Sequence, residues 1–387
     1  MSSISLSGFR GTLALVCVLA AVGLAAPVAS AGNRGAALPG LAVPPRQGAQ
    51  ERNRSTFTVG TATATRGTKA LGTIEVPAGR DAALSIPVAV IHGARPGPVL
   101  ALVSGSHGTE YASIVAVSRL VGLLDPKSIT GTVILVPLVN PPSFHRMVPH
   151  LNPVDGLNMN RRYPGQADGT QTERASFQIT RQVIDQADYV IDMHGGDLDE
   201  SLWPFSYWAK TGNEAHDMAS KNLVLAFGLD HIVIQGAAAG RPRDPSQPSS
   251  LSGAVNARGK LGITVEAGHA GTIEPEDIRV LIDGTFSVMR HLKMLEGVSS
   301  PIANPVWIER IVTVASEADG MFYAVVQRGR FVQEGMRLGY ITDYLGRIVS
   351  EPKAPVSGIV MFVRAVPSLS KGETIAYVGP VLSGGGR

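Results

Sequence analysis

Residues 99–110 read VLALVSGSHGTE, and this stretch decides the class of fold. Its first five residues are all apolar, which is typical of a strand that is buried on both faces of a sheet. The glycine-containing turn that follows carries His107 and Glu110, and residues 111–124 then have the apolar spacing of a helix. A buried strand that leads through a polar turn into a helix predicts an α/β fold.

Apolar strands and helices continue to alternate along the chain. Further strands are predicted at residues 57–60, 72–76, 83–91, 131–138, 189–192, 232–234 and 261–266, and further helices at 173–187, 213–227 and 275–295. Residues 56–299 are therefore predicted to form one α/β domain, with a largely parallel or mixed sheet flanked by helices. Short alternating segments with glycine turns follow, so residues 300–387 are predicted to form a small all-β, barrel-like domain. We expect this domain to shield the cleft or to mediate assembly, which leaves a homo-oligomer open.

The amino terminus has the pattern of an export signal. Arg10 precedes a short apolar run, and Ala29-Ser30-Ala31 then supplies a small-x-small cleavage site. We expect residues 1–31 to be a signal peptide that is cleaved after Ala31, which predicts a secreted or periplasmic protein. Residues 32–55 are rich in Gly, Pro, Ala and Arg and are predicted to be a disordered linker. Later segments are too short or too polar to predict stable membrane insertion after cleavage.

Composition and missing motifs exclude several classes of protein. The formal net charge is +3 and 5% of the residues are aromatic, so we expect no nucleic-acid partner. The single cysteine, Cys17, lies within the predicted signal peptide, and the mature chain is therefore expected to contain no disulfide. Neither G-x-S-x-G nor H-E-x-x-H occurs, which excludes the common serine hydrolases and the helix-borne zinc proteases.

Three separate segments offer the side chains of a metal site. His107 with Glu110, His194, and Glu266 each come at or just after the end of a predicted strand. Ligands of open α/β sheets bind at the carboxyl ends of the strands, so we expect these side chains to meet there. Two histidines and one carboxylate are the ligand set of a catalytic zinc that keeps one position open for water. A further carboxylate outside that set would be the general base, although each residue alone could equally be an ordinary surface or strand-end residue.

The segment between these candidates is distinctive. It contains NPPSFHR at residues 140–146 and DGLNMNRRYPG at residues 155–165. Together with HGTE at 107–110, DMHG at 192–195 and EAG at 266–268, it resembles the succinylglutamate desuccinylase/aspartoacylase family, whose members are relatives of the zinc carboxypeptidases. The resemblance runs in the same order over roughly residues 70–298, and the tail resembles the small β-domain of that family.

The resemblance implies a reaction centre as well as a fold. It implies that His107, Glu110 and His194 bind one zinc ion per chain and that Glu266 is the general base and acid. Glu266 is flanked by apolar and small residues, so partial desolvation is expected to raise its pKa toward the working pH of a general base.

The resemblance also implies a site for a carboxylate of the substrate. Asn160 and Arg161 are expected to hold it, with Arg146 assisting, and a guanidinium beside an amide suits a carboxylate chemically. Thr109 and Met159 stand where the family typically has Asn and Leu. Neither departure removes a ligand, but both leave the identity of the substrate open.

Three functions stay open on the sequence alone. The first is a secreted zinc-dependent amidohydrolase that cleaves the amide bond of an N-acyl amino acid or a similar substrate bearing a carboxylate. The second is a zinc carboxypeptidase that acts on peptides or cell-wall fragments, because the same ligands serve both reactions. The third is a binding protein without turnover, which the complete ligand set disfavours. No motif indicates a nucleotide cofactor.

Overall fold

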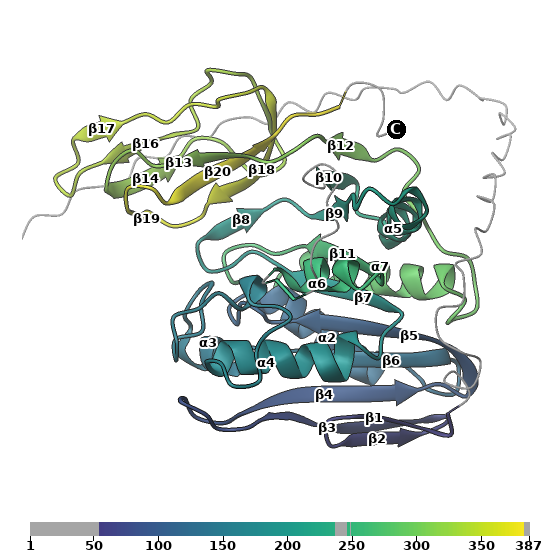
Figure 1. Ribbon diagram of the computed structural model, residues 1–387. Helices are drawn as coiled ribbons and strands as arrows, with labels where there is room; N and C mark the ends of the chain where they lie inside the picture. Colours follow the sequence, from purple (N-terminus) through teal and green to yellow (C-terminus); the bar gives the residue numbers. More distant parts are fainter. Residues whose placement is uncertain (1–53, 237–245, 248, 383–387) are drawn as a thin grey trace, which may run out of the picture. The chain divides into compact units, whose positions relative to one another are not determined.

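The computed structural model describes residues 54–236, 246, 247 and 249–382, and Figure 1 shows their arrangement. The predicted signal peptide and nearly all of the predicted linker lie outside the described residues. Among the residues that are described, no helix is both long and apolar enough to cross a membrane.

A nine-stranded mixed sheet forms the centre of the α/β region, which spans residues 56–308. Its order is β12-β10-β9-β11-β7-β5-β6-β4-β3. The strands are β3 (Thr68–Val76), β4 (Leu84–His92), β5 (Arg95–Ser104), β6 (Thr130–Val136), β7 (Tyr189–His194), β9 (Phe205–Ala209), β10 (His231–Gln235), β11 (Leu261–Glu266) and β12 (Val306–Ile308). The four strands β11, β7, β5 and β6 run parallel, whereas β3, β4 and β9 introduce antiparallel pairs. The predicted mixed α/β sheet is confirmed.

Helices cover both faces of this sheet. One face carries α2 (Tyr111–Leu123), α5 (Glu214–Phe227) and α7 (Pro275–His291), and the other carries α4 (Gln171–Ile179) and α6 (Leu251–Ala257). Residues 99–103 of β5 are all apolar because both faces of this part of the strand are buried. Leu100 and Leu102 pack into the core of the first face, and Val99, Ala101 and Val103 pack into the core of the second. Sequence patterns did not predict several short elements of this region, including β2 (Ala62–Thr65), α3 (Pro141–Arg146), η1 (Met159–Arg161), β9 and α6. Strand β1 (Thr56–Val59) corresponds to the predicted strand at 57–60, and η2 (Thr180–Ile184) lies within the predicted helix at 173–187.

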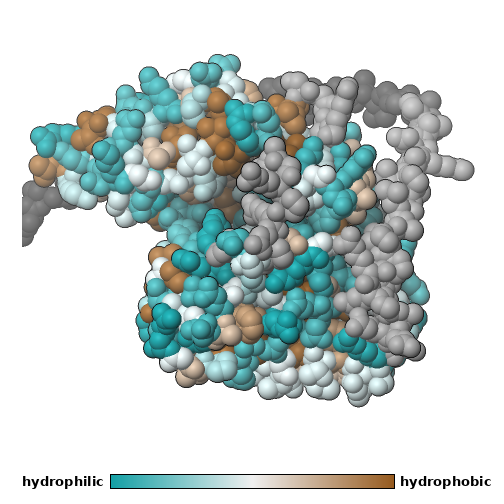
Figure 2. Space-filling view, in the orientation of Figure 1, coloured by the Kyte–Doolittle hydropathy of each residue, from teal (hydrophilic) through white to brown (hydrophobic). Residues whose placement is uncertain are grey.

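The C-terminal part of the chain is all-β, as predicted. It contains β13 (Val312–Ala315), β14 (Gly320–Ala324), β15 (Phe331–Val332), β16 (Gly339–Thr342), β17 (Ile348–Ser350), β18 (Gly358–Arg364), β19 (Ser368–Leu369) and β20 (Thr374–Gly379). These strands form two small antiparallel sheets around their own apolar core. On the face seen in Figure 2, apolar side chains gather on the surface of this C-terminal β-region.

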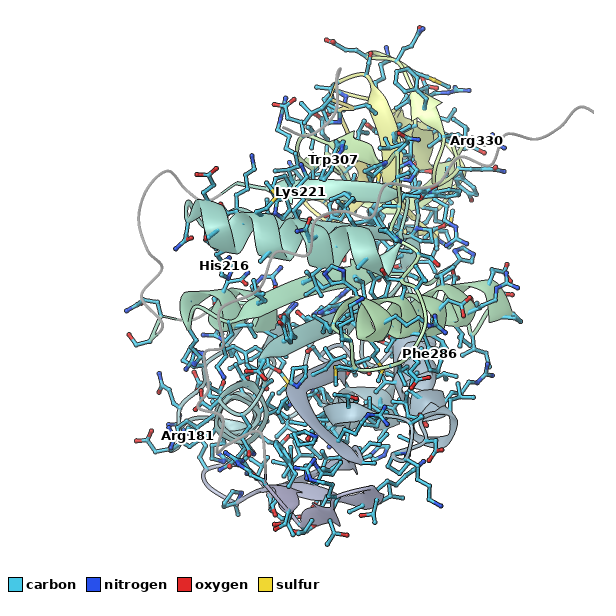
Figure 3. The ribbon with its side chains drawn as sticks, turned by 90° about the vertical axis from the view of Figure 1, so that its right-hand side faces the viewer. Arg181, His216, Lys221, Phe286, Trp307 and Arg330 are labelled. Atoms are coloured by element: carbon cyan, nitrogen blue, oxygen red, sulfur yellow. The ribbon has the colours of Figure 1, made fainter. Side chains whose placement is uncertain are left out.

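The two regions share strands across their boundary. Strand β12 follows the predicted boundary at residue 300, yet it pairs with β10 in the large sheet. Trp307 of β12 packs against Trp208 with ring centroids 5.5 Å apart, and the ammonium of Lys221 on α5 lies over both rings. Lys221 and Trp307 are labelled in Figure 3. In the other direction, β8 (Glu200–Leu202) pairs with β18 of the C-terminal β-region. The all-β part therefore begins after Ile308.

Candidate metal centre and active site

Three adjacent parallel strands bring the predicted metal ligands together. Strands β5, β7 and β11 are neighbours, so their carboxyl ends lie at one edge of the sheet. His107 and Glu110 follow β5, whereas His194 is the last residue of β7 and Glu266 the last residue of β11. Glu266 and His194 are direct partners in the β11–β7 register. This is the convergence that the strand-end positions predicted.

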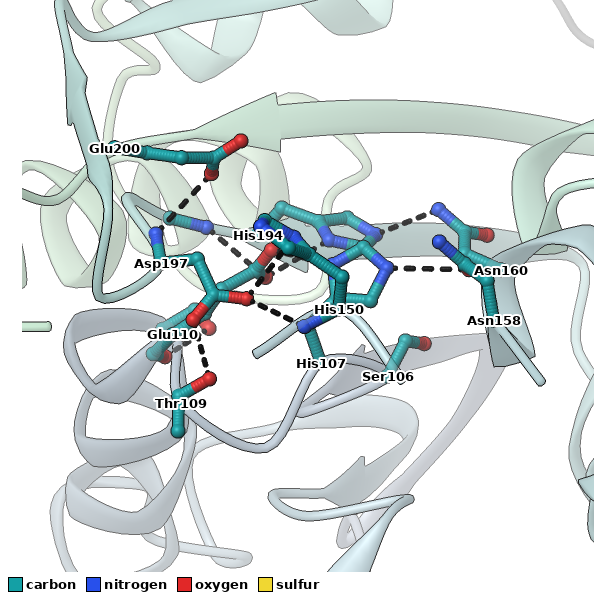
Figure 4. A network of polar contacts seen from close by, with 12 residues as sticks. Ser106, His107, Thr109, Glu110, His150, Asn158, Asn160, His194, Asp197 and Glu200 are labelled. Atoms are coloured by element: carbon teal, nitrogen blue, oxygen red, sulfur yellow. Dashed lines mark hydrogen bonds and ion pairs between the residues drawn. The ribbon is translucent and has the colours of Figure 1, made fainter. Parts of the chain in front are cut away.

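Glu110 lies between two imidazole rings, as Figure 4 shows. Its Oε1 is 2.6 Å from Nδ1 of His107, and its Oε2 is 2.9 Å from Nδ1 of His194. The ligand atoms of the three residues all lie within 4.8 Å of one another. Glu110 and His194 are buried, and His107 is largely so. The three side chains therefore present an N, O, N donor set from one side of the sheet edge.

The surroundings of the outer ring nitrogens bear on whether this donor set fits a metal. Nε2 of His107 lies 3.2 Å from Oδ1 of Asn158, and Nε2 of His194 lies 3.1 Å from Oδ1 of Asp192. Both carboxylate oxygens of Asp192 are buried without a hydrogen bond from the described residues. A histidine that binds a metal through Nδ1 carries its proton on Nε2 and needs an acceptor there. Asn158 supplies such an acceptor for His107. At His194 an oxygen of Asp192 lies within reach of Nε2, but the amide Nδ2 of Asn160, which is a donor, faces the same nitrogen at 3.0 Å.

Electrostatics in the site also favour a cation. Burial acts to raise the pKa of the Glu110 carboxyl, but the charges of His194 and His107 outweigh it and lower the pKa to about 2. Burial opposes protonation of His194, but Glu110 and Asp192 raise its pKa well above the ordinary value. The buried carboxylates thus draw positive charge onto the rings, and a bound divalent cation would supply that charge instead.

Glu266 stands beside the donor set as a separate carboxyl group. Burial raises its pKa well above the ordinary value of 4.5; His194 acts against this rise, and the nearby Glu110 and Glu200 add to it. None of the described residues donates a hydrogen bond to its carboxylate. A carboxyl with a raised pKa beside a candidate metal site has the properties of a general base and acid.

The residues predicted to hold a substrate carboxylate lie in different settings. Asn160 is buried; its Oδ1 accepts a hydrogen bond from Leu251 N–H at 2.9 Å, and its Nδ2 lies 3.0 Å from Nε2 of His194. Arg161 is exposed, and its Nη1 donates to the backbone oxygen of Asn160 at 2.8 Å. Arg146 is exposed in the last turn of α3, and the described contacts include none between it and the other candidates. The substrate-binding role of all three stays a prediction.

Two tyrosines that sequence reasoning did not identify lie close to these groups. Burial raises the pKa of Tyr207 on β9, and the charges of Glu266 and Glu200 raise it further while Arg161 lowers it. Burial likewise raises the pKa of Tyr377 on β20, with Glu200 and Glu266 adding to the rise. The C-terminal β-region thus contributes a tyrosine next to the candidate base. Tyr377 is far from the other residues in sequence, and no local pattern indicates this proximity.

A second network that sequence reasoning did not identify surrounds His150. Its Nδ1 lies 3.2 Å from Asp197, and its Nε2 lies 3.0 Å from Asp199. Burial opposes protonation of His150, but the hydrogen bond to Asp199 and the charges of Asp197 and Glu200 outweigh it and raise the pKa to about 9. The ring packs edge-on against His107, with centroids 5.9 Å apart. The raised pKa of His150 favours its protonated form, and its contacts with Asp197, Asp199 and His107 hold the ring against the site.

The glycines after His194 let two backbone segments touch. A Cβ on Gly196 would lie 2.7 Å from the carbonyl oxygen of Gly268, and one on Gly195 would lie 2.6 Å from that of Ala267. These glycines therefore admit the loop that follows Glu266.

The α/β sheet and the histidine–carboxylate cluster at its edge define a hydrolase-like metal site. The catalytic-domain model of the succinylglutamate desuccinylase/aspartoacylase family matches residues 96–292, which is just over half of the chain. The chain belongs to this family, and the predicted family is confirmed. It is a family of deacylases that act on N-acyl amino acids.

Individual relatives agree with this assignment over most of the chain. The N-alpha-acetyl-L-2,4-diaminobutyric acid deacetylase of Halomonas elongata is 27% identical over 80% of this chain and 91% of its own length. A succinylglutamate desuccinylase from a Silicibacter species is 26% identical, covers 81% of this chain and 95% of its own, and superposes with a TM-score of 0.73. The ectoine utilization protein EutE from Ruegeria pomeroyi, in its product-bound structure, is 26% identical with a TM-score of 0.72 over 80% of this chain and 95% of its own.

Proposed function

We propose that this chain is a zinc-dependent deacylase that hydrolyses the amide bond of an N-acyl amino acid. The observation that carries the proposal is the orientation of the two imidazoles. Nδ1 of His107 and Nδ1 of His194 both face Glu110, and the ligand atoms of the three residues lie within 4.8 Å of one another. His107, Glu110 and His194 would hold one zinc ion per chain, and a three-ligand set of this kind would keep one position for water or substrate.

The reaction divides between the metal and the protein. A bound zinc ion would supply Lewis-acid activation of the acyl carbonyl and of water. Glu266 takes a proton from the attacking water and later donates it to the nitrogen of the leaving amine. The bond from the acyl carbon to water oxygen forms and the C–N bond breaks, which yields a carboxylic acid and a free amino acid. The raised pKa of Glu266 suits both steps, because a group that accepts and returns a proton works best when its pKa is near the operating pH.

Arg161 is the candidate anchor for the α-carboxylate of the substrate. It is exposed, and its charge and that of Glu266 both act on the pKa of Tyr207, so Arg161 and Glu266 both lie within electrostatic range of this tyrosine. Asn160 supports the ring of His194 from behind through its amide. The deacetylase from Halomonas elongata acts on N-alpha-acetyl-L-2,4-diaminobutyric acid. An acetylated diamino acid is therefore the first substrate to test for this chain.

A secreted or periplasmic setting is part of the proposal and rests on the leader sequence of residues 1–31. The alternative function is a zinc carboxypeptidase that acts on peptides or cell-wall fragments. The two functions differ in which amide is cut, because a carboxypeptidase releases the last residue of a chain and a deacylase releases a small acyl group. The same purified protein can be tested for both.

The test is a substrate panel on mature protein that begins at residue 32 and is loaded with zinc. N-acetyl and N-succinyl amino acids, including acetyldiaminobutyrate, are compared with short peptides, and released amine is measured. We expect turnover of an N-acyl amino acid that is lost after chelation, and a fall in kcat of about 100-fold or more in Glu266→Gln. Release of C-terminal residues without deacylation would establish the carboxypeptidase instead. Turnover of neither substrate class would overturn the proposal.

A further inference from the structure

An arginine of the C-terminal β-region donates hydrogen bonds to the backbone of the α/β region, called the catalytic region below. Arg328 lies in the turn between β14 and β15. Its Nη1 donates hydrogen bonds to the carbonyl oxygen of Leu202 and, at 3.1 Å, to that of Gly268. One guanidinium nitrogen thus joins two catalytic-region segments that are distant from it in sequence.

These two carbonyls belong to the segments that carry the acidic groups of the site. Leu202 ends β8, which begins at Glu200, and Gly268 lies two residues after Glu266. The same segments are also joined to each other, since Ala270 N–H donates to the carbonyl oxygen of Glu200 at 2.7 Å. Arg328 therefore binds the loop that follows Glu266 and the end of β8 at the place where these two segments contact each other.

The turn that carries Arg328 packs closely against Trp203 and β18. Gly329 has a φ of +76°, and a Cβ there would lie 2.3 Å from the ring of Trp203. Its N–H donates to the carbonyl oxygen of Val360 on β18 at 2.7 Å. A side chain at this position would push the turn away from Trp203, so glycine allows the close approach that places the guanidinium.

We propose that Arg328 is a positioning residue for Glu266. Hydrogen bonds from a charged donor are stronger than those between neutral groups, and Arg328 donates them to backbone that lies just after the end of β11 and at the end of β8. Without them the loop after Glu266 keeps its backbone contacts with β8 but loses the donor that ties both segments to the C-terminal β-region. A displacement of about 1 Å in a catalytic group can reduce turnover about 100-fold. The inference rests on the proposed function in one respect, namely that Glu266 is the catalytic base.

The test compares Arg328→Ala with Arg330→Ala. Arg330 is exposed two residues further along the same turn (Figure 3), so its replacement removes the same charge without touching either carbonyl. We expect Arg328→Ala to lower kcat by about 10- to 100-fold, with KM and bound zinc little changed. Millimolar guanidinium should restore part of the lost kcat by entering the vacated space. Arg330→Ala should match the wild type and should not respond to guanidinium.

Hydrogen exchange supplies a readout that does not depend on activity. The amides of Ala270 and Gly271 donate to the carbonyl oxygens of Glu200 and Gly196, and they should exchange faster in Arg328→Ala than in Arg330→Ala. If Arg328→Ala does not fold, Arg328→Lys replaces it, because lysine keeps the charge but not the planar donor group. It should show an intermediate kcat and intermediate exchange.

The outcomes separate this inference from the proposed function. Wild-type kcat and unchanged exchange in the Arg328 variant would overturn the positioning role, even if the chain is an active deacylase. Loss of kcat together with loss of zinc and no guanidinium response would also overturn it, since that pattern indicates general damage. If the wild type cleaves no N-acyl amino acid, the proposed function fails, whereas faster exchange would still support the structural contact made by Arg328.

Discussion

Replacement of Glu200 by glutamine is expected to stabilise the folded chain at neutral and mildly alkaline pH. Burial raises the pKa of Glu200 from its ordinary 4.5 to about 7; His150 opposes this rise, and Glu110 and Asp197 add to it. Oε2 of Glu200 accepts a hydrogen bond from the backbone N–H of Asp197 at 3.1 Å. The amide oxygen of glutamine can accept the same hydrogen bond, so the substitution removes the charge and keeps the contact.

The sign follows from proton binding in the two states. The folded chain holds the Glu200 proton more tightly than the unfolded chain, so its contribution to stability is complete below pH 4.5 and is lost as pH rises through about 7. The difference between the two pKa values corresponds to at most about 3 kcal/mol. Glutamine suffers no such loss. The variant should therefore exceed the wild type in free energy of unfolding by up to about 3 kcal/mol above pH 7, with little difference near pH 4.5.

The assay is urea unfolding of metal-free protein at about pH 5 and about pH 8, followed by far-ultraviolet circular dichroism. Metal is removed because a bound cation would itself lower the pKa of Glu200. Glu334→Gln is the matched control, since Glu334 is exposed in the C-terminal β-region. A wild type and a Glu200→Gln variant with the same dependence of stability on pH would refute the reasoning.

Three further predictions concern the site itself. Asp192→Asn removes the charge that faces Nε2 of His194, and it should weaken zinc binding about 10- to 100-fold in chelator competition; unchanged affinity would contradict the role of Asp192. Arg161→Lys keeps the charge but not the two-pronged donor, and it should raise KM about tenfold with a smaller effect on kcat. An unchanged KM would exclude Arg161 as the carboxylate anchor. Glu266 must lose its proton to act as a base, so kcat/KM should fall as the pH is lowered through the raised pKa of Glu266. A fall in kcat/KM that begins only near the ordinary pKa of a glutamate would contradict the raised pKa.

The parts of the fold that local sequence could predict are those whose signal lies within a few residues. The run at 99–103 is apolar at every position because β5 is buried on both faces. The same kind of apolar run precedes His194 and Glu266, so the ends of the predicted strands already indicate where the site residues meet. The predicted ligands His107 and Glu110 are brought to one place for this reason.

The parts that local sequence could not predict depend on pairings between distant segments. Strand β8 has three residues, and it exists because β18 pairs with it from the C-terminal β-region. Glu200 and Tyr377 reach the site through that pairing and through the packing of β20, so no spacing in the chain marks them. Asn160 shows that local sequence also cannot predict which contacts a polar side chain makes. Its residue type suits substrate binding, but whether its amide is engaged by α6 and His194 can be read only from the folded structure.

The central claim is that His107, Glu110 and His194 form a zinc site. Elemental analysis of purified mature protein, in the wild type and in His194→Ala, tests it most directly. The account predicts about one zinc ion per wild-type chain and loss of zinc in the variant, because three protein ligands are needed to hold a catalytic zinc. No zinc in the wild type after zinc has been offered, or equal zinc in both proteins, would contradict it.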